Sequence, residues 1–311
     1  MTAMSVVGEE DALGREVAAA ASAAAGAVLI PEVPGIASVL HMELAVSKER
    51  VKRLVLRWPR LIEVSGYNVG QRVHWLIETL GLTREQVAKL VLAHPPILIK
   101  SIRRQLEPNL NWLEDDMGLA RSEVRKIVHA CPQLLVKSVS TNFLPKIEFF
   151  VQDIGINIAQ VKVMLLRYPQ LFNFSRENMA WKARYLTEEI LLTPKQLRSV
   201  ISRCPAVFAY SIESNLVPTV TFFVKGLGAT KTQIRDAVVK QPRLLGMSLE
   251  RRLVPRWLEL HKAGVTPSWH LHHQIMLFAG DSVFLTWLEK ETAGRHTVEG
   301  ARGPTKQGRA R

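Results

Sequence analysis

The sequence has little cysteine and no long apolar run. Among its 311 residues are only Cys131 and Cys204, so a disulfide framework is excluded and a reducing compartment fits. No uninterrupted apolar stretch reaches the roughly 18 residues of a membrane span, so we expect no membrane partner. We interpret residues 1–34 as a disordered or targeting leader. Its transit signal is weak, because Arg15 is the only basic residue among the first 30.

Signatures of catalysis are also missing. The sequence contains no glycine-rich phosphate loop and no G-x-S-x-G nucleophile turn, and its carboxylates form no recurrent inward pair. His270, His272 and His273 stand together, but without a nearby carboxylate they make a weak metal site. We therefore expect no enzyme, no cofactor and no metal, and we interpret the two cysteines as buried free thiols.

Acidic residues are few compared with basic ones. There are 28 Asp and Glu against 41 Lys and Arg, which gives a formal charge of +13 and a pI near 10.0. Such a balance favours a polyanionic partner, a nucleic acid above all.

What the sequence does contain is a repeat. Prolines that follow apolar helical runs recur every 36 or 37 residues, and a serine stands six residues after each of them. Six matches at two linked positions exclude chance. The prolines are Pro59, Pro95, Pro132, Pro169, Pro205 and Pro242, and the serines are Ser65, Ser101, Ser138, Ser175, Ser211 and Ser248.

The segment before each proline predicts an amphipathic helix of about 11 residues. Apolar residues stand eight, five and four positions before the proline, the spacing of one buried helical face. "TREQ", "TPKQ" and "TKTQ", at the starts of three of these helices, are typical capping boxes.

The segment after each proline predicts a tight 3₁₀ turn and then a second helix. The proline ends the first helix, and the serine six residues later is expected to cap the next. Most second helices carry a proline seven residues past the serine and end at a glycine, which adopts the left-handed conformation easily. The fourth repeat has Leu191 in the glycine position and lacks this second proline, and Ala45 takes the glycine position of a partial unit before the first repeat.

Each unit is a helix, a turn and a helix, and cannot bury its apolar face alone. We therefore predict an all-α fold, an α-solenoid or curved superhelix of about seven 36–37-residue repeats over residues 35–290. A terminal cap opens at Thr266, and residues 291–311 read as a basic disordered tail.

The linked proline, serine and glycine positions resemble the mitochondrial transcription termination factor family, mTERF. "SLERRLVPRW", Ser248 to Trp257, is similar to that family's final repeat, and "DSVFLTWLEK" to its C-terminal segment. The resemblance covers about residues 40–290. It implies a mitochondrial or chloroplast protein that holds nucleic acid in a basic concave groove and acts in organelle gene expression.

Two rows of basic residues are candidates for phosphate contact, because recurrence at one repeat position would line one face. The first row stands two residues before the prolines, where a cation also complements its helix dipole. The second lies in the turn and at the start of the second helix, where the dipole disfavours a cation and a phosphate would explain it. The first row is Arg57, Arg167, Arg203 and Lys240; the second is Lys100, Arg103, Arg104, Lys137, Arg176, Arg243, Arg251 and Arg252.

Three functions are compatible with these rows. The leading hypothesis is a monomeric double-stranded DNA-binding regulator of organelle transcription that terminates or pauses the polymerase. The second is an RNA-binding factor for organelle intron splicing, or for ribosomal RNA maturation and ribosome assembly. Organelle transcription or ribosome-assembly proteins are further candidate partners under either hypothesis. The third is a protein-interaction scaffold, in which the basic rows would scatter over both faces.

Overall fold

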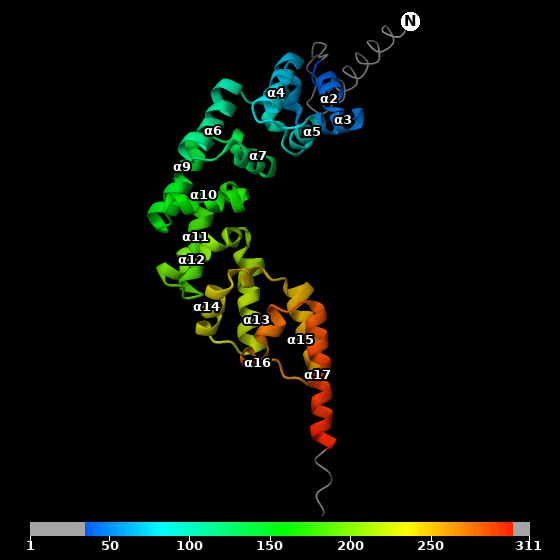
Figure 1. The fold of residues 1–311 in the computed structure, drawn as a ribbon, viewed down its shortest axis with the longest axis vertical. Helices are drawn as coiled ribbons and strands as arrows, with labels where there is room; N and C mark the ends of the chain where they lie inside the picture. The colour runs from blue at the N-terminus through cyan, green and yellow to red at the C-terminus, as the bar shows by residue number, and fades with distance from the viewer. Residues whose placement is uncertain (1–34, 301–311) are drawn as a thin grey trace, which may run out of the picture. The chain divides into compact units, whose positions relative to one another are not determined.

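The computed structural model describes residues 35–300, and these residues form helices and turns with no strand (Figure 1). The fold is therefore an all-α repeat fold, as predicted. The chain divides into two compact units. Unit 1 ends at Asn173, apart from the short segment Ile154–Ile156; that segment and the chain from Phe174 onward form unit 2.

The first helix of every repeat ends two residues before the repeat proline. Its buried side chains follow the predicted spacing, as Val87, Leu90 and Val91 do in the second repeat. A partial unit, α2 (Ile36–Leu44), precedes the first repeat. The first helices are α3 (Lys48–Arg57), α5 (Arg84–Ala93), α7 (Arg121–Ala130), α10 (Ile158–Arg167), α12 (Pro194–Arg203) and α14 (Lys231–Lys240).

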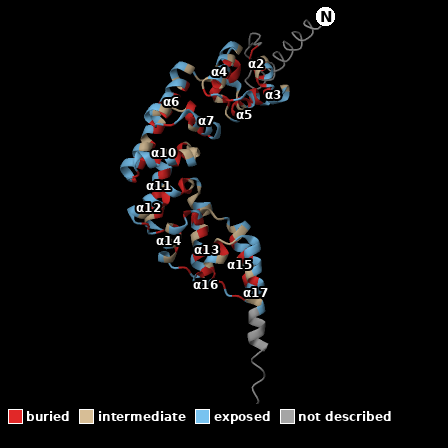
Figure 2. Cartoon of the chain, viewed as in Figure 1, coloured by how far each residue is buried: buried red, intermediate tan, exposed pale blue. Residues whose placement is uncertain are grey.

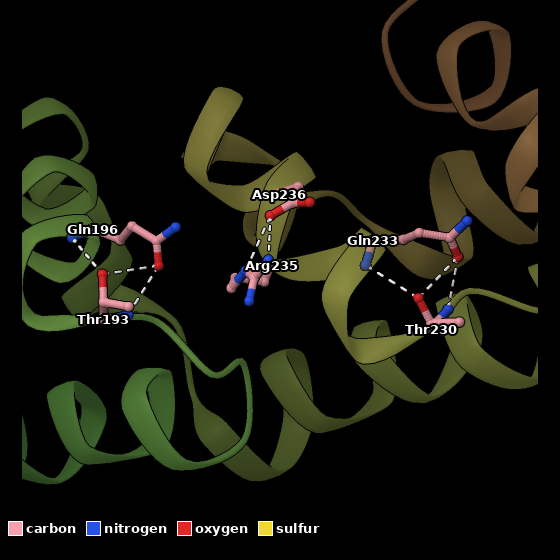
Figure 3. A network of polar contacts seen from close by, with 6 residues as sticks. All are labelled: Thr193, Gln196, Thr230, Gln233, Arg235 and Asp236. Atoms are coloured by element: carbon pink, nitrogen blue, oxygen red, sulfur yellow. Dashed lines mark hydrogen bonds and ion pairs between the residues drawn. The ribbon is translucent and has the colours of Figure 1, made fainter.

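The caps of these helices confirm the predicted capping boxes. In α12, Gln196 N–H donates to Thr193 Oγ1 at 3.3 Å and Thr193 N–H donates to Gln196 Oε1 at 2.9 Å. Figure 3 shows this pair beside the equivalent Thr230 and Gln233 of α14. Helix α7 has only half of the box, because Ala120 offers no side-chain acceptor while its N–H donates to Glu123.

The segment after the proline is a 3₁₀ turn in five repeats, as predicted. In the third repeat it forms a short α-helical turn instead, closed by the Lys137 N–H bonding to the Gln133 carbonyl at 3.0 Å. The turns are η1 (Pro59–Glu63), η2 (Pro95–Ile99), α8 (Gln133–Val136), η7 (Pro169–Asn173), η8 (Pro205–Ala209) and η10 (Pro242–Gly246).

The second helices begin at the six repeat serines, and every one of these serines accepts a bond from the N–H three residues later. Two of the helices are continuous, α4 (Gly66–Glu78) and α11 (Arg176–Glu188). The other four open into π-helical turns. They consist of η3 (Ile102–Leu106), α6 (Glu107–Asn111) and η4 (Trp112–Asp116); η5 (Val139–Phe143), α9 (Leu144–Glu148) and η6 (Phe149–Asp153); η9 (Ile212–Leu216) and α13 (Val217–Leu227); and η11 (Leu249–Leu253) and α15 (Val254–Lys262).

The π-turns occur only in those second helices that contain a proline, the second proline of their repeat. Pro108, Pro145, Pro218 and Pro255 lie seven residues past their serines, where the continuous helices α4 and α11 have Arg72 and Lys182. A proline inside a helix has no N–H and clashes with the carbonyl four residues back. The wider turn relieves this clash, since the Leu106 N–H reaches the Ser101 carbonyl five residues back at 3.1 Å.

The core of each unit lies between successive repeats, where Figure 2 shows the buried stripes of the helices. In unit 1, the Phe143 ring stacks on Trp112 at 5.5 Å and meets Phe172 edge-on at 5.9 Å. In unit 2, Phe223 meets Trp269 at 5.4 Å. Large rings thus join one repeat to the next.

The C-terminal segment differs from the prediction in two places. Helix α16 (Trp269–Leu277) begins after Ser268, which caps it, because Pro267 separates Thr266 from the helix. Helix α17 (Asp281–Gly300) continues past Glu291, where the sequence placed the start of a disordered tail. Its buried Phe284 and Leu288 anchor the first turns, and no proline interrupts the residues that follow. The predicted leader, residues 1–34, and residues 301–311 lie outside the described residues.

Candidate nucleic-acid interface

Part of the second basic row, including Arg103, Arg104 and Arg251, is positioned by the serine caps. Each serine fixes the first turn of a second helix, so residues two and three positions past it project from a defined helix start. In the second repeat these residues are Arg103 and Arg104, and both are exposed. Side chains held at fixed helix starts suit repeated contact with phosphates along a strand.

Most of the candidate cations are open to solvent. Their side chains make no hydrogen bond or ion pair within residues 35–293, so they are available to an external anion. This group is Arg57, Arg103, Arg104, Arg167, Lys240, Arg243 and Arg251, all exposed, together with the half-buried Lys100.

Four candidates are held by the protein itself. Lys137 donates to Asn173 Oδ1 at 3.2 Å, and Arg252 donates to the Ala279 carbonyl at 2.5 Å. Arg203 donates to the Val239 and Lys240 carbonyls at the end of α14, which favours the helix-dipole interpretation for this residue. Arg176 is half-buried and also engaged in an interaction.

A groove in unit 1 brings two of the exposed arginines together. It lies between α4 and the start of η3 and has a volume of about 590 Å³. Arg103 and Arg104 line it from η3, and Arg72, His74 and Trp75 from α4. We call it the α4–η3 groove. Among the described residues that line it, Glu78 alone is a carboxylate, against Arg72, Arg103 and Arg104, so the groove is suited to an anion. Glu78 Oε2 lies 2.8 Å from His74 Nε2.

A smaller groove in unit 2 has a mixed charge. Its volume is about 230 Å³, and Arg251, Arg252 and Arg256 share it with Glu259 and Asp281. Arg256 Nη2 contacts Asp281 Oδ1 at 2.5 Å, and this guanidinium keeps the pKa of Asp281 below its usual value. Because Arg256 is already paired with Asp281, this groove is less suited to a phosphate than the α4–η3 groove.

A row of polar side chains, four of them buried and one half-buried, was not predicted. Each comes from the middle of a second helix, seven or eight residues past the serine, and donates to a backbone carbonyl of the following repeat. Lys146 Nζ reaches the Phe172 carbonyl at 2.6 Å, and Lys182 Nζ reaches the Phe208 carbonyl at 2.5 Å. Arg72, Asn109 and Arg256 make equivalent bonds to Lys100, to Leu134 and Lys137, and to Ile275, Met276 and Ala279.

These donors satisfy carbonyls that the short turns leave open. Burial lowers the pKa of Lys182, an effect that Glu213 partly offsets. The sequence signal for this row was a polar residue that recurs seven or eight positions past the serine, within the apolar stripe of the second helix. The carbonyl that accepts its hydrogen bond belongs to another repeat, so the spacing within one repeat could not predict it. Basic residues in this row hold repeats together and are not free for nucleic acid.

The cysteines and histidines take structural roles. Cys131 and Cys204 are buried free thiols, as predicted, and burial raises the pKa of both. His272 accepts from the Ser268 N–H at 3.0 Å, and the His273 ring stacks on Trp269. Over the part of the chain that the structure describes, no group of three or more His, Cys, Asp or Glu side chains is placed to hold a metal ion.

No helix among the described residues is both long enough and apolar enough to cross a membrane. A search of curated proteins found no relative that matches the chain. The family model of mTERF matches it twice, over residues 37–161 and 153–285, which together cover most of its length and both compact units. This is a family of helical-repeat, nucleic-acid-binding proteins of organelle gene expression, and is not known as a family of enzymes. The repeat helices, their serine caps and the family match agree: the chain belongs to the mTERF family.

Proposed function

We propose that the protein binds double-stranded DNA in an organelle, mitochondrion or chloroplast, and regulates transcription there by terminating or pausing the polymerase. The observation that carries the proposal is a set of exposed cations at the starts of second helices that have no partner among the described residues, Arg103 and Arg104 above all. They occupy positions where a helix dipole disfavours positive charge, so a phosphate is the partner that accounts for them.

The proposed mechanism is capture of the DNA backbone. Each phosphate that a Lys or Arg neutralises releases condensed counterions, so affinity arises without base recognition and falls steeply with salt. The net charge of +13 favours rapid association with a polyanion. A protein bound along the duplex in this way obstructs an advancing polymerase.

A second candidate function is RNA binding in splicing or ribosomal RNA maturation. It is favoured by the α4–η3 groove, which offers the Trp75 ring beside Arg103 and Arg104. Single strands expose the base faces that aromatic side chains stack on.

Competition binding separates the candidates. The full chain is titrated with labelled duplex DNA, and unlabelled duplex or single-stranded RNA of the same sequence competes at matched salt. The DNA proposal expects the duplex to compete better and the affinity to fall with salt. Better competition by RNA favours the second candidate, and no binding to either in dilute buffer rejects both.

Localisation and occupancy in cells complete the test. A tagged chain with its natural N-terminal segment should co-purify with organelles. Sequencing of the DNA and RNA bound to it there should return organelle DNA with polymerase accumulated beside the bound positions. Recovery of organelle RNA alone would contradict the transcriptional proposal.

A further inference from the structure

The α4–η3 groove breaks a local rule that the last three repeats obey. Two residues past the serine, those repeats carry a glutamate, which the N-terminal end of a helix favours. The second repeat carries Arg103 there and Arg104 next to it. Both side chains are exposed, and neither has a partner among the described residues. A departure of this kind with no compensation inside the fold points to a ligand.

An aromatic ring stands in the same groove. Trp75 lines it from α4, is half-buried, and makes no hydrogen bond through its indole N–H within the described residues. Six residues before the left-handed residue that ends each second helix, the second to fifth repeats also carry an aromatic ring: Trp112, Phe149, Tyr185 and Phe222. Trp112 and Phe149 are buried, whereas Trp75 is half-buried and lines an open groove. An indole that lines an open basic groove can accept the face of a base.

The walls of the groove are fixed relative to each other. Arg72 Nε donates to the Lys100 carbonyl at 2.6 Å, and this bond ties α4 to the residue before the Ser101 cap. Ser101 in turn accepts from the Arg104 N–H at 3.2 Å, which sets the first turn of η3. A site whose walls are already in place loses little entropy when it binds.

We propose that the α4–η3 groove binds one nucleotide of a single-stranded nucleic acid, with its phosphate on Arg103 and Arg104 and its base against Trp75. The volume of about 590 Å³ accommodates one nucleotide. The inference rests on the proposed function, since it assumes that the protein binds nucleic acid. It adds that an unpaired strand binds in the α4–η3 groove.

Photocrosslinking tests the site on the unaltered chain. The full-length protein is irradiated with a short RNA, and separately with the DNA of the same sequence, each carrying one 5-iodouracil. Mass spectrometry then locates the adduct. We expect it on the peptide that carries Trp75, and the stronger of the two arms identifies which kind of strand the groove prefers. Adducts confined to other peptides of a chain that binds these strands would overturn the assignment.

Affinity measurements test the role of the ring. Trp75→Leu should weaken single-strand binding roughly 5- to 100-fold, the effect of removing one stacked base, and change duplex binding less than about twofold. Trp75→Phe, which keeps an aromatic face, should retain most of the affinity. Circular dichroism verifies the fold of each variant, and if Trp75→Leu does not fold, the crosslinking result decides.

A matched pair of variants tests the arginines. Arg103→Ala with Arg104→Ala should reduce the slope of log K against log salt by roughly 0.7 for each phosphate that is no longer neutralised. Arg84→Ala with Lys126→Ala removes the same charge from exposed positions of unit 1 outside the groove and should change the slope less. Equal changes in both pairs, or an unchanged affinity of Trp75→Leu, would reject the groove assignment while nucleic-acid binding stands. Failure of the wild type to bind duplex or single strand would instead reject the proposed function.

Discussion

At the scale of single residues, the residue that follows each second helix adopts a left-handed conformation, and its identity sets the conformational cost of the turn into the next repeat. Five of these positions are glycines with φ between 60° and 77°. Leu191 holds the same place in the fourth repeat with φ 62°, and Ala45 does so after α2 with φ 51°. For a residue with a Cβ this conformation costs roughly 1–2 kcal/mol. The two positions therefore hold strain that glycine would remove.

We expect Leu191→Gly to raise the free energy of unfolding by about 1 kcal/mol, because the Leu191 side chain is 42 % exposed and contributes little packing to set against the strain. Gly228→Ala is the reciprocal variant. A Cβ at Gly228 would meet no atom within 4 Å, so its expected loss of about 1 kcal/mol reports backbone strain alone. Urea denaturation measures both, and a loss of stability in Leu191→Gly would show that its side chain packs more than its exposure suggests.

The two thiols give a prediction of pH dependence. Burial raises the pKa of Cys131 and Cys204 above the ordinary value of 9.0. Above about pH 9 the unfolded thiols lose their protons while the folded ones keep them, so the folded state binds more protons and stability falls as pH rises. Below that pH the contribution is fully present.

Labelling with a thiol reagent at pH 8 should accordingly be on the order of 10² times slower for the folded chain than in denaturant, since reaction requires local opening. The double variant Cys131→Ala with Cys204→Ala should lack the fall in unfolding free energy that the two thiols cause above about pH 9. Rapid labelling of the native protein would contradict the burial of the thiols.

At the scale of elements, the first helices are nearly identical units that differ in their caps. Four of them carry a complete capping box, and α7 has the glutamate half alone because its N-cap is Ala120. The Ala120 backbone is extended, with φ −66° and ψ 149°, close to the −71° and 157° of Thr83. The geometry for the missing bond is therefore already present.

We expect Ala120→Thr to stabilise the protein by about 1 kcal/mol, because the new hydroxyl can accept from the Glu123 N–H. Thr83→Ala should lose a similar amount by removing the bond from Gln86 N–H, which is 3.2 Å long. Thermal unfolding of the two variants provides the comparison. If Ala120→Thr is neutral while Thr83→Ala is destabilising, the bond that the Glu123 N–H already donates to the Ala120 carbonyl at 2.8 Å is sufficient for this donor.

The second helices show where prediction from sequence ends. Their serine caps and terminal glycines could be predicted, because each depends on residues a few positions apart in the chain. The π-turns were not predicted, although the prolines that accompany them were seen, because a proline inside a helix can be met by a kink, a break or a wider turn. The contrast between α4 and η3–α6 shows that the chain uses the wider turn.

At the scale of the whole molecule, the repeat period together with the linked proline, serine and glycine positions was enough to predict an all-α repeat fold and the family. Contacts between repeats were not predictable, since they depend on which backbone groups a neighbouring repeat presents. Lys182 illustrates this limit, because its charge alone suggested nothing of its bond to the Phe208 carbonyl. Sequence did not distinguish the members of the basic rows from one another. The structure does: Arg103 has no bonding partner among the described residues, whereas Arg203, which is also exposed, donates to carbonyls at the end of α14.

This separation predicts two different responses to the removal of positive charge. Replacing the exposed Arg103, Arg104 and Arg251 by alanine should leave the free energy of unfolding within about 0.5 kcal/mol of wild type. The same triple variant should reduce the slope of log K against log salt for duplex DNA by up to roughly 0.9 per residue, because each replacement leaves one phosphate without its cation.

Replacing the held Lys137, Arg203 and Arg252 removes an equal formal charge but also their bonds to Asn173, to the end of α14 and to Ala279. We expect this triple variant to lose on the order of 1 kcal/mol of stability for each bond and to retain most of the salt slope, because these side chains are engaged inside the fold. Denaturation and salt-dependent binding of both variants give the comparison. Equal slopes in the two variants would mean that net charge, and not the exposed helix starts, governs association, and the proposed interface would then be wrong.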